Sequence, residues 1–200
     1  MNRYIPYSRQ TIDTKDIKHV TSALRRDLIT TGSLTNEFEK NFSKKTNVNF
    51  SVSCNSGTSA IHLALDAINL KSKDKVVIPA INFPAAANIS KLYDAQIFFA
   101  DVNPITGQME PKNLEECIKK NNIKKLKVFF VMHNGGHSNY SKDFFKLKKK
   151  YNCYCIEDAC HALGAKYSKD KKDTIGNCRY SDITTFSFHP LKSITTGEGG

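Results

Sequence analysis

The sequence predicts an α/β fold, a three-layer α/β/α sandwich with a largely parallel sheet. Two observations support this prediction. Short apolar runs alternate along the chain with amphipathic stretches of helix length, which is the pattern of strands joined by helical crossovers. The runs are also apolar on both sides, as is usual for strands that are covered on both faces. Sheets of this kind bind ligands at the carboxyl ends of their strands.

The first 45 residues are predicted to be a separate helical segment. Apolar residues recur there at helical spacing in two sets, with the turn sequence TTGS between them. The first set is Ile17, Val20 and Leu24, and the second is Leu34, Phe38 and Phe42. We therefore expect an N-terminal helical segment at 1–45 and one large domain at 46–200.

Six apolar runs predict the strands of the sheet. They are FSVSC (50–54), KVVIPA (75–80), QIFFAD (96–101), LKVFFVM (126–132), NCYCIEDA (152–159) and DITTFSF (182–188). Helices are predicted at 59–68, at 113–119 behind the first-turn proline Pro111, and at 142–150. The connection INFPAAAN is interpreted as a turn.

The composition limits the class of protein. With 200 residues and 40% hydrophobic content, the chain can bury one sizeable core. Its formal net charge of +11 comes largely from lysine runs, which fall at the ends and outer faces of predicted helices with few aromatic residues between them. This arrangement favours a solvated surface over a nucleic-acid-binding patch. It is also compatible with a basic active-site mouth for an anionic substrate.

The six cysteines include no CxxC pair, and their spacing fits neither a zinc site nor a compact disulfide framework. We therefore expect no metal, and thiols that are reduced and mostly buried. The start MNRYIPYSRQTID has no apolar leader region, and no run approaches the length that crosses a bilayer. These features predict a soluble, cytoplasmic protein without membrane contact.

Two polar motifs lie at predicted strand exits, where α/β enzymes bind ligands. The motif Asn55-Ser56-Gly57-Thr58 runs directly into a helix. Its free N–H groups and hydroxyls can hold a phosphate, although a plain helix cap is the commoner role of such residues. The strand ending in IEDA places Glu157 and Asp158 on opposite sides of the sheet, and His161 follows three residues after Asp158.

An aromatic residue and a lysine occupy two further strand exits. Phe83 can cover a planar ligand, although core packing is the default role of a phenylalanine. Lys192 stands between a strand end and a Gly-rich loop, where desolvation makes an amine nucleophilic. A phosphate cradle, an aromatic cover, a carboxylate and an amine together fit pyridoxal 5′-phosphate. Lys192 would form the Schiff base, and the carboxylate would keep the pyridine nitrogen protonated.

Five segments of the chain add a family resemblance. They are TTG (30–32), NSGTSA (55–60), PAINFPAAAN (79–88), IEDACHALGA (156–165) and YSDITTFSFHPLKSITTGEGG (180–200). Together they resemble the DegT/DnrJ/EryC1/StrS family of nucleotide-sugar aminotransferases, and the block SFHPLKSITTGEGG is highly specific. The resemblance covers essentially the whole chain and implies the large domain of a fold-type I pyridoxal-phosphate-dependent transferase.

The resemblance implies roles for individual residues. Lys192 is implied to be the catalytic Schiff-base lysine and proton shuttle, Asp158 the partner of the pyridinium nitrogen, and His161 a contact near the ring hydroxyl. The implied phosphate ligands are Ser56, Gly57, Thr58 and Ser187, and Phe83 is implied to stack on the ring. The candidate substrate contacts are Thr31, Gly32, His133 and His189.

The implied reaction moves an amino group from L-glutamate to the 4-keto carbon of a UDP-linked 4-keto-6-deoxy-N-acetylhexosamine. Such a reaction belongs to pseudaminic acid or surface-polysaccharide biosynthesis, and the resemblance implies a homodimer. The lysine at position 192 argues against the dehydratase branch of the family, which has histidine there. Two departures from the family pattern are the second histidine, His137, in the segment HNGGH and the shorter chain. We therefore expect a cofactor-binding half of a longer enzyme.

Three alternatives stay open from the sequence. The first is a related aminotransferase that acts on another nucleotide keto sugar. The second is a catalytically incomplete fragment that binds pyridoxal phosphate or a partner. The third, which is the least favoured, is a basic nucleic-acid-binding protein.

Overall fold

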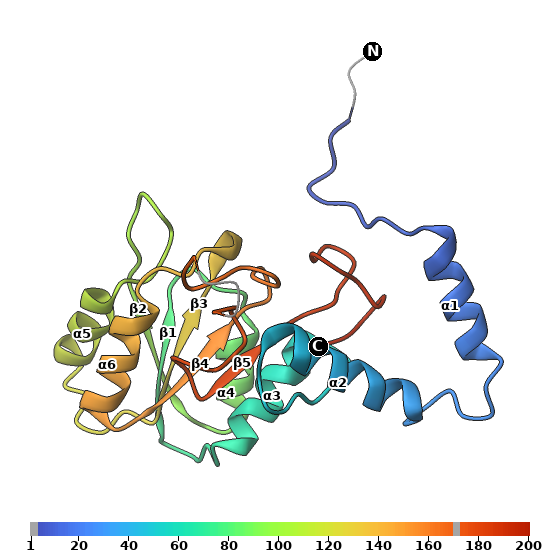
Figure 1. Cartoon of the computed structure of the whole chain (residues 1–200). Helices are drawn as coiled ribbons and strands as arrows, with labels where there is room; N and C mark the ends of the chain where they lie inside the picture. Colours follow the sequence, from blue (N-terminus) through green and yellow to red (C-terminus); the bar gives the residue numbers. More distant parts are fainter. Residues whose placement is uncertain (1–3, 170–172) are drawn as a thin grey trace.

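The structure, a computed structural model, describes residues 4–169 and 173–200 and contains one five-stranded parallel sheet (Figure 1). The strand order is β2-β1-β3-β4-β5. The strands are β1 (Lys75–Pro79), β2 (Gln96–Ala100), β3 (Val128–Met132), β4 (Tyr154–Asp158) and β5 (Ile183–Thr185). Every ladder is parallel, so the prediction of a largely parallel sheet is confirmed.

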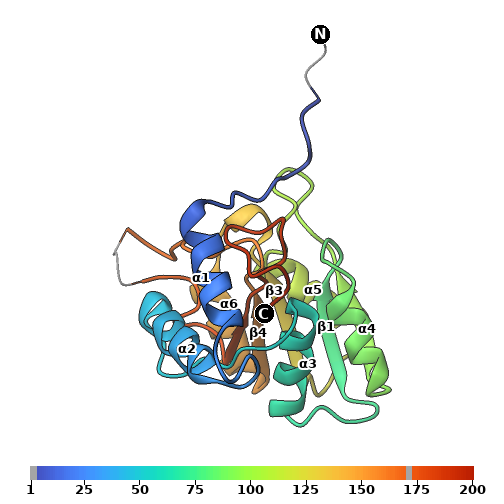
Figure 2. The same cartoon turned by 90° about the vertical axis from the view of Figure 1, so that its right-hand side faces the viewer.

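Helices cover both faces of the sheet, which confirms the predicted sandwich (Figures 1 and 2). They are α3 (Gly57–Ala67) and α4 (Ala85–Leu92) on one face, and α5 (Pro111–Lys120) and α6 (Ser141–Tyr151) on the other. Because side chains alternate along a strand, Phe130 of β3 packs with α3 and α4, whereas its neighbour Phe129 packs with α5 and α6. The residues of both apolar layers are buried, so the sheet is held from two sides.

The pairing register places the carboxyl ends of the central strands at one level. Met132 of β3 is the register partner of Asp158 of β4, and Asp158 is in turn the partner of Thr185 in β5. The residues that follow these strands therefore meet at one edge of the sheet. This edge is where the polar motifs of the sequence come together.

Two helices precede this body, as the periodicity predicts: α1 (Thr14–Leu24) and α2 (Ser33–Thr46). Phe42 of α2 makes edge-to-face contacts with Phe186 and Phe188, with ring centroids 5.1 and 5.5 Å apart. These contacts attach α2 to the chain that follows β5. In contrast, α1 has no buried residue, and it stands away from the sheet in Figure 1. The boundary at residue 45 stays a prediction.

The predicted first strand, 50–54, is wrong for this structure. Phe50 is 86% exposed, and the segment joins no ladder. Its polar groups are satisfied otherwise, because Ser53 donates to the Glu39 side chain and Cys54 exchanges two backbone hydrogen bonds with Gly200. An alternating sequence cannot form a strand where no neighbouring strand receives its hydrogen bonds.

Two other boundaries also differ from the prediction. The segment INFPAAAN is not a simple turn, because Pro84 is the N-cap of α4 and the alanines after it are helical. Alanine has the highest helix propensity, and this signal was available in the sequence. Strand β5 ends at Thr185 rather than at residue 188, because Phe186 and Phe188 leave the sheet to pack on α2.

None of the helices in the described ranges is long and apolar enough to span a bilayer. The six cysteines, all of which lie in the described part of the chain, are free thiols.

We expect Phe130→Ala to lower the free energy of unfolding by about 3–5 kcal/mol, because its side chain is fully buried between β3 and the α3–α4 layer. The measurement is equilibrium unfolding in urea. The matched control is Phe99→Ala on β2, where the side chain is 59% exposed, and its effect is expected to stay below about 1 kcal/mol. Equal effects of the two substitutions would contradict the assignment of Phe130 to the core.

Candidate active site

A cavity of about 550 Å³ opens at the carboxyl edge of the sheet. Its wall is built from the start of α3, the loop between β1 and α4, the end of β4 and the segment after β5. It contains most of the residues that the sequence nominated, namely Ser56, Gly57, Thr58, Phe83, Asp158, His161, Ser187, His189 and Lys192. The polar motifs at separate strand exits therefore converge on one site.

The first turn of α3 provides an anion cradle in this wall. Ser56 caps the helix, since its Oγ accepts from the Ser59 N–H at 3.1 Å. The N–H groups of Gly57 and Thr58 have no acceptor within the described residues, and they lie at the positive end of the helix dipole. A Cβ at Gly57 would stand only 2.8 Å from Ser187 Cβ, so glycine is needed for Ser187 to reach the cradle.

Asp158 ends β4 with its side chain on the α3 and α4 side of the sheet. The residue is 1% exposed, and its Oδ1 accepts from the Cys160 N–H at 3.1 Å. The Cys160 thiol is a second hydrogen-bond partner of the same side chain. No ion pair to this carboxylate occurs within the described residues. A buried carboxylate whose donors come from one residue, and which has no cation paired with it, is stabilised by a further donor or cation, and a ligand in the cavity can supply it.

Lys192 lies in the loop after β5, and its backbone N–H donates to the His189 carbonyl at 2.9 Å. Its ammonium acts on two neighbours across the cavity. Burial and the Lys192 charge lower the pKa of His161. The Lys192 charge also acts to lower the pKa of the Cys160 thiol, but burial and the nearby Asp158 outweigh it and raise that pKa, so the thiol stays protonated. Of these groups, the lysine is the one that can act as a nucleophile or proton carrier after losing its proton.

Phe83 is 64% exposed, although a phenylalanine is usually buried, and it lines the cavity beside Asn82. An exposed aromatic ring in a cavity wall can cover a planar ligand. Sequence reasoning missed Asn82 and Tyr7, which also line the cavity. An asparagine next to the aromatic residue at a strand exit was a usable signal for the first of them.

Three candidate substrate contacts lie outside this cavity. Thr31 and Gly32 belong to the connection between α1 and α2, and neither lines the cavity wall. His133 is 1% exposed and lies on the α5 and α6 side of the sheet, beneath the cavity. It is a partner of Glu157 in this structure.

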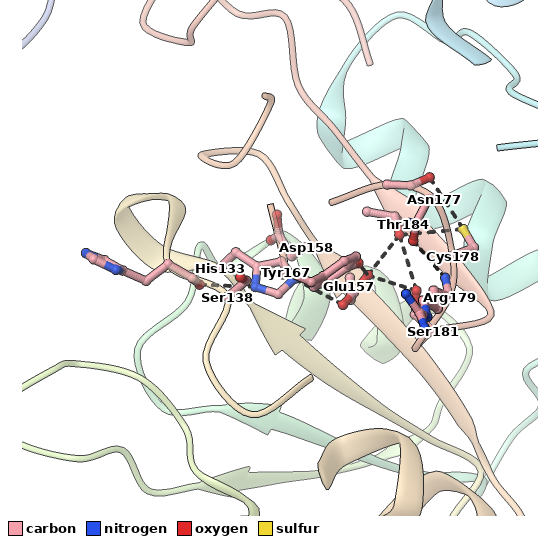
Figure 3. A network of polar contacts seen from close by, with 12 residues as sticks. His133, Ser138, Glu157, Asp158, Tyr167, Asn177, Cys178, Arg179, Ser181 and Thr184 are labelled. Carbon is pink, nitrogen blue, oxygen red and sulfur yellow. Dashed lines mark hydrogen bonds and ion pairs between the residues drawn. The ribbon is translucent and has the colours of Figure 1, made fainter. Parts of the chain in front are cut away.

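A buried network around Glu157 underlies the site (Figure 3). Its Oε2 accepts hydrogen bonds from three hydroxyls, those of Tyr167 at 2.5 Å, Ser181 at 2.8 Å and Thr184 at 3.0 Å. Its Oε1 lies 3.1 Å from His133 Nε2, close enough for an ion pair although not aligned as a regular hydrogen bond. The carboxylate thus joins the ends of β3 and β5 to the loops between β4 and β5.

The charges in this network follow from its geometry. His133 Nδ1 faces the His137 carbonyl at 3.1 Å, so both ring nitrogens of His133 face oxygen atoms. Burial alone would raise the pKa of Glu157, but His133 and the hydroxyls of Tyr167 and Ser181 outweigh it and lower that pKa. Burial and Glu157 raise the pKa of Tyr167 far above its usual value.

No cluster of three or more metal-ligating side chains is present in residues 4–169 and 173–200. The cavity wall offers hydroxyls, backbone N–H groups, the imidazoles of His161 and His189, the carboxylates of Asp158 and Glu198, and the amine of Lys192 as its polar chemistry. This set suits an organic ligand that carries a phosphate and a basic nitrogen.

Comparison with known proteins identifies relatives over nearly the whole chain. The model of the DegT/DnrJ/EryC1/StrS aminotransferase family matches residues 10–200. The chain is 39% identical over 196 residues to a UDP-4-amino-4,6-dideoxy-N-acetyl-beta-L-altrosamine transaminase of Campylobacter jejuni, which covers 98% of this chain and 50% of that protein. It is 33% identical to the GDP-perosamine synthase of Escherichia coli O157:H7, over 99% of this chain and 52% of that protein.

A third relative is the UDP-4-amino-4-deoxy-L-arabinose–oxoglutarate aminotransferase of Shewanella sediminis, which is 31% identical over 100% of this chain and 49% of that protein. Among solved structures, Helicobacter pylori PseC, an aminotransferase involved in pseudoaminic acid biosynthesis, is similar with a TM-score of 0.89 and 27% identity, covering 98% of this chain and 51% of that one.

A sugar aminotransferase of Streptococcus pneumoniae, solved in its PLP form, is similar with a TM-score of 0.87 and 29% identity, covering 98% of this chain and 52% of that one. The chain thus spans about half the length of the curated relatives it matches. These structures confirm the predicted fold-type I architecture.

We expect Glu157→Gln to lower the free energy of unfolding at pH 7 by about 3–5 kcal/mol, because it removes a buried carboxylate that accepts from three hydroxyls and lies 3.1 Å from His133 Nε2. The lowered pKa means that Glu157 stabilises the native state above its unfolded-state pKa and loses this effect as the pH falls through its folded-state pKa. The variant should therefore lose less stability than the native chain between pH 7 and about pH 3.

Urea unfolding at several pH values measures both effects. The control is Glu37→Gln on the exposed face of α2, which should change stability by no more than about 0.5 kcal/mol at any pH. An unchanged pH dependence in Glu157→Gln would show that the carboxylate is not ionised in the native state.

Proposed function

The chain belongs to the DegT/DnrJ/EryC1/StrS aminotransferase family, and from this premise we propose that its cavity binds pyridoxal 5′-phosphate and serves amino transfer to a nucleotide-linked keto sugar. The observation that carries the proposal is the convergence of four different groups on one cavity: the α3 cradle, Asp158, Phe83 and Lys192. Each of these groups would bind a different part of the cofactor. The fit rests on the donor set of this chain as well as on the family.

The cradle and the buried carboxylate provide the sharpest fit. Ser56, Gly57 and Thr58, with Ser187 beside them, would hold the phosphate at a helix start where N–H groups lack acceptors. Asp158 would accept the ring N–H, which answers the need of its buried carboxylate for a donor. A pyridinium nitrogen beside a carboxylate stays protonated.

When bound, pyridoxal phosphate supplies an aldehyde that carries the amino group and a ring that takes up electrons from the substrate. Lys192 would hold the cofactor through its amine, and after release it would take a proton from the donor carbon as a general base. His161, whose pKa is lowered, would be neutral near pH 7 and able to hydrogen-bond the ring oxygen. Phe83 would cover the ring and exclude water.

The substrate part of the proposal is a UDP-linked 4-keto-6-deoxy-N-acetylhexosamine, with L-glutamate as amino donor. The names of the Campylobacter relative and of the Helicobacter structure support the sugar and the pseudaminic acid setting. The name of the Shewanella relative supports the glutamate and oxoglutarate couple. A homodimer and a cytoplasmic location complete the proposal.

Two alternatives have specific support. The GDP-perosamine synthase relative favours a related enzyme acting on another nucleotide sugar. The chain spans about half of its relatives, and this favours a cofactor-binding unit whose turnover needs further residues. Assays with UDP-, GDP- and dTDP-linked 4-keto sugars and L-glutamate separate the first alternative from the proposal. Cofactor binding without transfer would support the second.

We expect borohydride to fix pyridoxal phosphate covalently on Lys192, because that amine lies in the same cavity as the phosphate cradle. The measurement is peptide mapping by mass spectrometry after reduction of the purified chain incubated with the cofactor. Lys192→Ala should abolish the specific label, whereas Lys142→Ala, on the exposed side of α6, should keep it. A label on another lysine, or none, would contradict the proposed cofactor site.

We expect Gly57→Ala to weaken pyridoxal phosphate binding about tenfold or more, because the added Cβ would meet Ser187 Cβ at 2.8 Å and Cys160 Sγ at 3.3 Å. Fluorescence titration with the cofactor measures the dissociation constant. The matched control is Gly32→Ala. Gly32 does not line the cavity, and its added Cβ would lie 3.4 Å from the nearest atom, the Leu28 carbonyl oxygen, so this variant should bind pyridoxal phosphate normally. Normal binding by Gly57→Ala would remove the α3 cradle from the site.

A further inference from the structure

The side-chain amide of Asn82 is buried without a partner. Both Nδ2 and Oδ1 are shielded from solvent, and neither has a hydrogen-bond partner among the described residues. Asn82 lines the candidate active-site cavity between β1 and α4, next to Phe83. An amide left unpaired in this way is destabilising, because both of its groups lose their hydrogen bonds to water and gain none in return. Unsatisfied polar groups in a cavity wall point to a ligand that completes them.

The helix that follows Asn82 also begins with N–H groups that lack hydrogen-bond acceptors. Pro84 is the N-cap of α4 and provides no side-chain cap, and the first intrahelical hydrogen bond runs from the Asn88 N–H to the Pro84 carbonyl at 2.9 Å. The N–H groups of Ala85 and Ala86 have no acceptor in the described part of the chain, and Ala86 is fully buried. Ala85 itself lines the cavity. The positive end of α4 is thus open toward the site.

These groups are separate from the α3 cradle. The cradle lies at Ser56–Thr58 at the start of α3, whereas Asn82 and Ala85 lie at the start of the neighbouring helix α4. Both helices begin at the carboxyl edge of the sheet and pack on the same face. The cavity therefore has two helix starts that attract anions, and the proposed cofactor has one phosphate to place there.

We propose that Asn82 and the first turn of α4 form a subsite for the amino-acid donor, in which the donor's carboxylate accepts from the Asn82 Nδ2–H. This inference rests on the proposed function and identifies a specificity residue within it. The chemistry of the amide favours an amino acid over the diphosphate of the nucleotide sugar. Both halves of the amide lack partners among the described residues. An amino acid that enters the cavity offers a carboxylate acceptor and, before its amino group is passed to the cofactor, an ammonium donor, whereas a diphosphate offers acceptors alone.

The test is calorimetric titration of the purified chain, loaded with pyridoxal phosphate, with α-methyl-L-glutamate. This probe keeps the carboxylate and the ammonium but lacks the proton whose removal starts the reaction. We expect Asn82→Ala to weaken its binding about tenfold, the effect of one hydrogen bond to a charged group. Asn82→Asp should weaken it further, because the new carboxylate repels that of the donor. Asn88→Ala, at an exposed position of the same helix, should leave it unchanged.

Titrations of the same variants with UDP and with pyridoxal phosphate complete the design, and both affinities should stay within about twofold of the native values. Unchanged affinity for α-methyl-L-glutamate in Asn82→Ala, or no binding of this probe by the native chain, would overturn the inference. So would a loss confined to UDP or to the cofactor. Labelling of Lys192 distinguishes failure of the proposed function from failure of the subsite. If Lys192 of the native chain is not labelled, the proposed function is contradicted. If Lys192 is labelled but Asn82→Ala binds α-methyl-L-glutamate as tightly as the native chain, the subsite alone is contradicted.

Discussion

The buried carboxylate of Glu157 is the constraint on which the carboxyl edge of the sheet depends. One charged group receives three hydroxyls and an imidazole that come from β3, β5 and the loops between β4 and β5 (Figure 3). An isolated carboxylate at this depth would not remain charged, so all these partners must be in place together. The network therefore fixes the relative positions of the strand ends, and it does so without occupying the cavity above them.

Adjacent carboxylates in β4 have opposite roles because strand residues alternate between faces. Glu157 points to the α5 and α6 side, where four residues surround its carboxylate, and Asp158 points to the α3 and α4 side, where Cys160 provides its hydrogen bonds. The first residue holds the strand end rigid, and the second gains a defined position from it. A site that must hold a cation-bearing ligand needs both features, since a mobile carboxylate would find a partner within the protein.

Much of this arrangement could be predicted from local sequence. Five of the six apolar runs correspond to the five strands of the sheet. The residues that follow these runs provide most of the polar groups in the cavity wall. The failures have physical causes. The segment at 50–54 alternates like a strand, but pairing needs a neighbour that periodicity does not reveal. His133 follows a strand as the cavity residues do, yet its side chain falls on the other face, where Glu157 is its partner.

The N-termini of α3 and α4 determine where the cavity wall attracts anionic groups of a ligand. Ser56 caps α3 with its own hydroxyl, so that the remaining N–H groups face a compact anion, and Gly57 lets Ser187 approach them. The start of α4 has proline where a capping side chain would stand, and Asn82 nearby has its amide unpaired. The wall of the same cavity also contains Asp158 and Lys192, a carboxylate and an amine. A ligand that carries two anionic groups and a basic nitrogen would complement this wall, because each helix end, with its unmet N–H groups, gains most from an acceptor of its own.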